Sequence, residues 1–67
     1  VKKIIDLYSK ACLGGFGIGC SNLGGIYDDG ILVPKDLKRA ISYYSDGCSM
    51  GSESACHYYK LRTKSKK

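Results

Sequence analysis

The chain has 67 residues, four cysteines and a formal net charge of +5. A chain of this length forms one small domain at most and buries only about 60% of its unfolded surface, which excludes a multi-domain enzyme or a large closed active site. With 43% apolar and 25% charged residues the chain is typical of a globular protein, and no apolar run approaches the ~20 residues that span a bilayer.

The sequence contains an internal repeat with a period of 36 residues. A shift by this period superposes Cys12 on Cys48 and Cys20 on Cys56, and it gives seven identical pairs among the 31 that overlap. The other identical pairs are Lys2 and Lys38, Ile5 and Ile41, Tyr8 and Tyr44, Ser9 and Ser45, and Gly15 and Gly51. Self-similarity at such a period indicates stacked structural units.

The spacing of apolar residues predicts four short helices joined by tight turns. The first ends at the glycine-rich turn 13–17, and the second runs from 18 to about 28. The linker 31–34 leads to a third helix opened by Asp36, and after the turn 49–52 a fourth helix covers 53–61. The predicted buried stripes follow helical offsets of 3 and 4: Ile4, Ile5, Tyr8, Ala11, Cys12; Cys20, Leu23, Gly24, Tyr27; Leu37, Ala40, Ile41, Tyr44, Cys48; Cys56, Tyr59 and Ala55.

The predicted fold class is therefore all-α: an αα-hairpin repeat solenoid. The family that residues 7–30 and 33–44 resemble implies, in addition, that it is a fragment of a right-handed superhelix. Residues 62–67 follow as a solvated basic tail. The net positive charge lies at this end, because the charges of residues 1–59 sum to zero. The net charge of +5 comes from Lys60, Arg62, Lys64, Lys66 and Lys67. We interpret this end as a solubilising cap; a basic peptide that acts on membranes or nucleic acid is a second alternative.

The four cysteines are predicted to form two disulfides, Cys12–Cys20 and Cys48–Cys56. Each pair flanks a turn, and antiparallel helices bring such positions together. The spacing within each pair does not match a zinc site, and His57 points away from its neighbour Cys56 on a helix. No metal ligand is therefore predicted, although free core thiols remain an alternative. Disulfides imply an oxidising compartment.

The runs LYSKACxxGxGxGCxNLGxxYxxG (residues 7–30) and VPKDLKRAxxYY (residues 33–44) resemble the Sel-one-like repeat, an αα-hairpin repeat related to the tetratricopeptide repeat. The paired cysteines resemble those of the Helicobacter-type cysteine-rich proteins. This resemblance implies one disulfide in each unit and a secreted or periplasmic location. It also implies binding of penicillin-like compounds with weak hydrolysis, a β-lactamase activity.

The resemblance divides the chain into a half-repeat 1–16, a full repeat 17–51 and a C-terminal half-repeat 52–61, before the basic tail 62–67. In the last unit, residues 58–60 replace the NLG motif of residues 22–24. The chain is therefore predicted to be the C-terminal part of a longer repeat protein. No signal peptide is recognisable in it.

No catalytic constellation is visible in the sequence. The penicillin-recognising SxxK pattern is absent, and His57, the only histidine, has just Glu53 at helical spacing. Such a pair is typical of a solvated surface. The run GGFGIG (residues 14–19) fits no phosphate-binding motif and is interpreted as a turn. No catalytic residue or cofactor is predicted.

The remaining prediction is a scaffold that binds proteins or peptides on the concave surface of the solenoid. Tyr43 and Tyr58 are predicted to be exposed, while the other tyrosines of the helical stripes belong to the core. No nucleic-acid partner or membrane span is expected, and further repeats of a parent chain are a possible partner. The candidate binding residues on helices two and four are Ser21, Asn22, Ile26, His57 and Tyr58.

Overall fold

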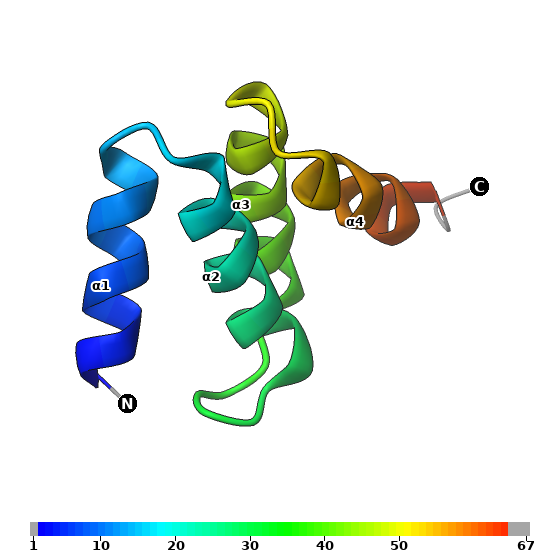
Figure 1. Cartoon of the computed structure of the whole chain (residues 1–67). Helices are drawn as coiled ribbons and strands as arrows, with labels where there is room; N and C mark the ends of the chain where they lie inside the picture. Colours follow the sequence, from blue (N-terminus) through cyan, green and yellow to red (C-terminus); the bar gives the residue numbers. More distant parts are fainter. Residues whose placement is uncertain (1, 65–67) are drawn as a thin grey trace.

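The computed structural model describes residues 2–64 and contains four α-helices within them. These are α1 (Lys2–Leu13), α2 (Gly17–Asp29), α3 (Leu37–Ser49) and α4 (Glu53–Lys64) (Figure 1). The prediction of an all-α, disulfide-stapled chain with four helices is confirmed. No helix in residues 2–64 has the length and apolar character needed to cross a bilayer.

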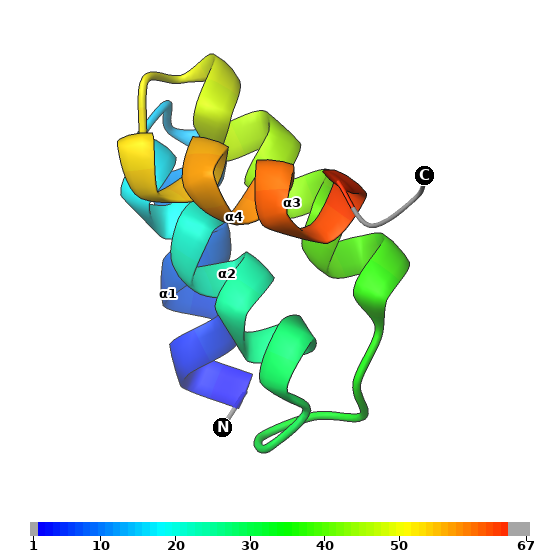
Figure 2. The ribbon, with the colours of Figure 1, turned by 90° about the vertical axis from the view of Figure 1, so that its right-hand side faces the viewer.

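The helix α2 lies at the centre of the molecule. It packs against α1 on one side and α3 on the other, and α4 also reaches it. The first three helices run up, down and up side by side, whereas α4 runs crosswise over α2 and α3 (Figures 1 and 2). One residue of α2 can therefore contact both α3 and α4.

The two hairpin turns, between α1 and α2 and between α3 and α4, are structurally equivalent at the 36-residue shift. Each turn contains a glycine with a positive φ, Gly15 at 95° and Gly51 at 93°, a region that L side chains rarely adopt. The turns also share backbone hydrogen bonds: Gly15 N–H to Cys12 C=O (3.1 Å) and Gly51 N–H to Cys48 C=O (3.0 Å), then Phe16 N–H to Ala11 C=O (2.9 Å) and Ser52 N–H to Gly47 C=O (3.0 Å).

A disulfide closes each hairpin beside its turn. One joins Cys12 to Cys20, with Cα atoms 4.7 Å apart, and the other joins Cys48 to Cys56, at 4.4 Å. In the chain-entropy model a loop this short contributes about 2.5 kcal/mol to the free energy of unfolding. Two such bridges matter here, because the folded state has a small core.

Small residues let the helices of each hairpin come close together. A Cβ placed on Gly19 of α2 would lie 2.7 Å from Cβ of Ala11 in α1. A Cβ on Gly47 of α3 would likewise lie 2.7 Å from Cβ of Ala55 in α4. The shift by 36 residues relates Ala11 to Gly47 and Gly19 to Ala55, so each hairpin pairs one glycine with one alanine and the two have exchanged helices. The two hairpins therefore share the same close contact between their helices, although the residue types at the two positions differ.

The core lies along α2, and all four helices contribute buried residues to it. Leu23, Cys20 and Ala40 are fully buried, and Tyr44 is only 2% exposed. A Cβ on Gly24 would lie 2.5 Å from both Cδ1 and Cε1 of the Tyr44 ring. The predicted packing role of Gly24 is thus to accommodate an aromatic ring, rather than to let two helix backbones touch.

Three sequence predictions fail at α4. This helix continues to Lys64, so residues 62–64 of the predicted basic tail are helical, and residues 65–67 lie outside the described residues. The extra turn is held by Arg62, which binds Asp28, and by Thr63, whose hydroxyl donates to the Tyr59 carbonyl at 2.8 Å. Tyr59 is 36% exposed and does not belong to the core.

Gly24→Ala should lower the free energy of unfolding by about 1–3 kcal/mol, because the added methyl group overpacks against a ring that cannot move away. Gly25→Ala is the matched control in the same helix. There a Cβ meets nothing closer than the Tyr44 hydroxyl, at 4.0 Å. This variant should gain about 0.5–1 kcal/mol from helix propensity. Urea unfolding of the oxidised proteins, followed by circular dichroism, measures both changes, and equal changes would contradict the proposed packing.

Candidate functional site

A groove of about 880 Å³ lies among the four helices. We call it the central groove, because residues of all four helices line it. Its walls come from Ile4 and Tyr8 of α1, Ser21, Asn22, Gly25, Ile26, Asp28 and Asp29 of α2, Leu32 and Lys35 of the linker, Tyr44 of α3, and Ser54, Tyr58 and Arg62 of α4.

Four of the five candidate binding residues line the central groove: Ser21, Asn22, Ile26 and Tyr58. Asn22 and Tyr58 are exposed there, whereas Ser21 and Ile26 are buried, with 8% and 9% of their surface exposed. The expectation that all of them point outward is therefore wrong for Ser21 and Ile26, since α2 is covered by helices on several sides. Whether any of the four contacts a ligand stays a prediction.

His57 is not among the residues that line the central groove. It is exposed on α4, and its ring meets the neighbouring Tyr58 ring edge-on, with centroids 5.5 Å apart. His57 therefore contacts one of the other four candidates, Tyr58, but does not line the groove with them.

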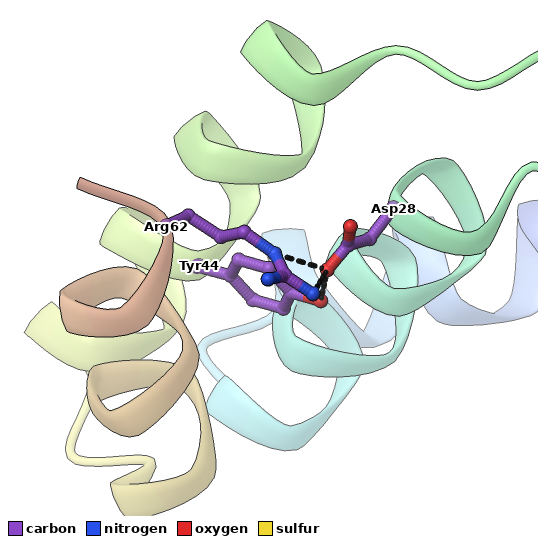
Figure 3. Close-up of polar contacts among 3 residues, drawn as sticks. All are labelled: Asp28, Tyr44 and Arg62. Atoms are coloured by element: carbon purple, nitrogen blue, oxygen red, sulfur yellow. Dashed lines mark hydrogen bonds and ion pairs between the residues drawn. The ribbon is translucent and has the colours of Figure 1, made fainter. Parts of the chain in front are cut away.

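A three-residue network, Asp28–Tyr44–Arg62, joins three helices at the wall of the groove (Figure 3). The Tyr44 hydroxyl donates a hydrogen bond to Oδ2 of Asp28 at 3.0 Å. Arg62 donates to the same oxygen through Nε at 2.7 Å, and its terminal nitrogen also lies 2.7 Å away. A single carboxylate oxygen of α2 therefore binds both α3 and α4.

Burial strengthens this network. The Asp28 side chain is 11% exposed and that of Arg62 is 39% exposed, so the ion pair is screened by water less than an ordinary surface pair. Burial raises the pKa of Tyr44 well above its usual range, and the hydrogen bond to Asp28 and the charge of that carboxylate raise this pKa further. The hydrogen bond and the charge of Asp28 also raise the pKa of Arg62. Tyr44 therefore stays neutral, as a hydrogen-bond donor, at neutral pH.

Aromatic contacts extend the network toward the exposed rim of the groove. Tyr58 of α4 stacks on Tyr44, with ring centroids 5.3 Å apart. Tyr58 is 41% exposed, but one face of its ring is held in place by stacking on the buried Tyr44 ring. At the same interface between α2 and α3, Tyr43 stacks on Tyr27 at 5.8 Å, and Arg39 lies over the Tyr27 ring at 5.2 Å. Tyr43, expected to be exposed, is half-buried for this reason.

The Asp28–Tyr44–Arg62 network was not predicted from the sequence. Asp28 was expected at the end of a helix, Tyr44 in the core and Arg62 in the tail. One signal was available: Gly24 and Asp28 are four residues apart, so they lie on one face of α2 and can receive one aromatic side chain. Nothing in the sequence pairs Arg62 with Asp28, because the crosswise course of α4 produces that contact.

The arrangement favours binding over catalysis. All four cysteines are in disulfides, so they supply no thiol nucleophile. The Asp28 oxygen already accepts hydrogen bonds from two side chains and is not poised as a general base. No group of three His, Cys, Asp or Glu side chains suited to a metal ion occurs in residues 2–64.

The chain is similar in sequence to cytochrome c oxidase assembly factor 7 of Xenopus tropicalis, with 40% identity over 64 residues. It is also 38% identical over 61 residues to cytochrome c oxidase assembly factor 7A of Xenopus laevis. These matches cover 88% and 84% of this chain, but only 28% and 26% of the frog proteins. The chain thus spans about a quarter of the length of these relatives. No family model and no solved structure matches it.

These relatives correct the family prediction made from the sequence. They are cytochrome c oxidase assembly factors, so the assignment to Sel-one-like, Helicobacter-type cysteine-rich proteins is wrong. The predictions of a secreted repeat scaffold and of β-lactamase activity are wrong for the same reason. The secreted or periplasmic location, which rested on that assignment, is also wrong. The cysteine spacing was misleading because it reports only the geometry of a short disulfide-closed hairpin.

The raised pKa of Tyr44 predicts a loss of stability at alkaline pH. As the pH rises past the ordinary tyrosine pKa of about 10, the unfolded chain loses this proton while the folded chain keeps it. The free energy of unfolding should therefore fall by up to about 1.4 kcal/mol per pH unit from this group. The Tyr44→Phe variant lacks this hydroxyl, so the stability advantage of wild type over the variant should be constant up to about pH 9 and should shrink by about 1.4 kcal/mol by pH 11. Urea titrations across this range test the prediction, and a pH-independent difference would contradict it.

Proposed function

We propose that this chain takes part in the assembly of cytochrome c oxidase, by holding a polypeptide in the central groove. The similarity to two assembly factors, which covers most of this chain, carries the proposal. The assembly of a multi-subunit enzyme requires contacts between proteins, and the groove is the described surface most suited to one. We place the chain in the mitochondrial intermembrane space, where two disulfides would persist.

The shape and chemistry of the groove support a polypeptide ligand. The groove is open along its length, whereas small-molecule sites bury 70–90% of a ligand. It offers hydrogen-bonding groups such as Asn22 and Asp29 beside apolar surface from Ile4 and Leu32. Tyr58 adds an exposed aromatic face that is already ordered by stacking on Tyr44. An ordered aromatic side chain suits an interface because little conformational entropy is lost when it binds.

We also propose that the two hairpins belong to an αα-hairpin array of the solenoid type, in which residues 1–16 are a half-repeat, 17–51 a full repeat and 52–61 a half-repeat. The equivalent turns and disulfides support the repeat, as does the exchanged glycine–alanine contact. In such an array each unit packs on its neighbours, and the concave side presents an extended binding surface. The central groove would be one segment of that surface.

A chimeric protein tests the proposed function. In Xenopus tropicalis cells that lack assembly factor 7, the frog factor should be supplied with its matching segment replaced by this chain. Assembled cytochrome c oxidase, measured on native gels, should recover. Asn22→Arg, which places a long cationic side chain in the groove, should lower this recovery at least about threefold. Ser42→Arg, at an exposed position of α3 that does not line the groove, is the matched control.

The abundance of each chimera must be measured alongside the assembled enzyme. A chimera that accumulates like the frog factor and leaves the oxidase at the level of the deficient cells would overturn the proposed role. Equal recovery with Asn22→Arg and Ser42→Arg would instead overturn the assignment of the groove.

A further inference from the structure

A second concavity, of about 430 Å³, lies between the two hairpin turns. Both turns are at the same end of the molecule (Figures 1 and 2). They touch each other, because a Cβ on Gly17 would lie 3.0 Å from Cβ of Ser52. We call this concavity the turn pocket. Its lining residues are Gly15, Phe16, Gly17 and Ile18 at the first turn, and Met50, Gly51, Ser52 and Ser54 at the second.

Equivalent positions of the two turns carry side chains of opposite character. At the shift of 36 residues Phe16 matches Ser52, and Ile18 matches Ser54. The Ser52 hydroxyl accepts a hydrogen bond from the Ala55 N–H at 3.3 Å and so caps α4. Phe16 is the N-cap residue of α2, but its side chain makes no capping hydrogen bond. A hairpin of this kind therefore forms with a serine at this position, and the fold does not require the aromatic ring.

The apolar side chains of the turn pocket are exposed to water. Phe16 is 66% exposed, Ile18 is 68% exposed and Met50 is 43% exposed. The Met50 sulfur lies 3.8 Å from Sγ of the fully buried Cys20, so this side of the pocket rests on the core. None of the described residues that line the pocket carries a charge. Such a surface suits an apolar side chain, and a methionine adapts to aliphatic and aromatic ones.

The turn pocket is continuous with the central groove. Ser54, in the first turn of α4, lines both concavities. A polypeptide in the central groove can therefore reach the turn pocket with one of its side chains. A second copy of this chain fits less well, because three partly exposed side chains give far less surface than the roughly 800 Å² per partner of a stable dimer.

We propose that the turn pocket binds an apolar or aromatic side chain of the polypeptide held in the central groove. This inference rests on the proposed function, and it adds the class of residue that the ligand contains. Phe16, Ile18 and Met50 contact the bound side chain, and its transfer from water provides affinity. The hydrogen-bonding groups of the groove contact the rest of the ligand.

Synthetic peptides test this proposal on the oxidised 67-residue chain. Four blocked octapeptides, Gly-Ser-Asn-Gly-X-Ser-Asn-Gly with X as Phe, Leu, Gln or Glu, differ only in the side chain offered to the pocket. Titration into isotope-labelled protein, followed by NMR, gives each dissociation constant and the amides that shift. The Phe and Leu peptides should bind at least about fivefold tighter than the Gln and Glu peptides. Their largest shifts should lie at Gly15, Ile18 and Gly51.

Phe16→Ser gives the first turn the residue of the second and makes the test specific. The preference for the Phe and Leu peptides should fall to less than about twofold. The unfolding equilibrium constant, measured in urea, should change by less than about threefold, because the new cap offsets the lost partial burial of the ring. Leu13→Ser is the matched control, since Leu13 is 85% exposed beside the same turn and does not line the pocket. This control should keep the preference.

The other outcomes would overturn the proposal in distinct ways. A rise of about tenfold or more in the unfolding constant of Phe16→Ser would make the ring a structural residue. Equal binding of all four peptides, or binding of none, would remove the pocket from the ligand site. Self-association of wild type that Phe16→Ser abolishes, measured by analytical ultracentrifugation, would assign the pocket to a second copy of the chain. The chimera tests oxidase assembly separately, so a failed chimera beside a clear peptide preference would overturn the assembly role and leave the pocket in place.

Discussion

The arrangement of the last three helices depends on one carboxylate oxygen. Oδ2 of Asp28 binds the Tyr44 hydroxyl of α3 and the guanidinium of Arg62 in α4. If Asp28 were neutral and unable to accept both bonds, Tyr44 would leave a buried hydroxyl unsatisfied, and α4 would lose its charged contact with α2. Leaving a buried polar group unpaired costs about 1–3 kcal/mol, a large fraction of the stability of a domain this small. The carboxylate also closes one wall of the central groove, so it links the fold to the candidate site.

The network can form only because the helices approach closely, and small residues make that possible. The two hairpins solve the same packing problem with the glycine and the alanine exchanged between partner helices. The hairpin contact therefore requires a small total volume rather than a glycine at one fixed position. At Gly24 the requirement is stricter, because the neighbouring atoms belong to a buried ring that is fixed by its hydrogen bond to Asp28.

Local patterns in the sequence were enough to predict the four helices, the two turns and the position of the core on α2 and α3. These features depend on apolar spacing and on glycines, which act over a few residues. The course of α4 could not be predicted in this way. Arg62 has the composition of a solvated tail and becomes part of the site only through a partner 34 residues earlier in the chain. Four of the candidate groove residues were found from the repeat, but their degree of burial was not, because it depends on how α4 crosses α2.

The family prediction failed for a different physical reason. A disulfide across a tight helical hairpin needs two cysteines near the turn at a fixed separation, whatever the protein does. The same spacing can therefore occur in unrelated families wherever the compartment is oxidising. Residues that differ between the units carry more information about role. Asn22 becomes Tyr58 at the rim of the groove, while Gly24 and Asp28 become two lysines on α4. The first difference places an aromatic ring, ordered by its stacking on Tyr44, among the residues that line the groove. The second removes from α4 the space and the carboxylate with which Gly24 and Asp28 of α2 receive the ring and the hydroxyl of Tyr44.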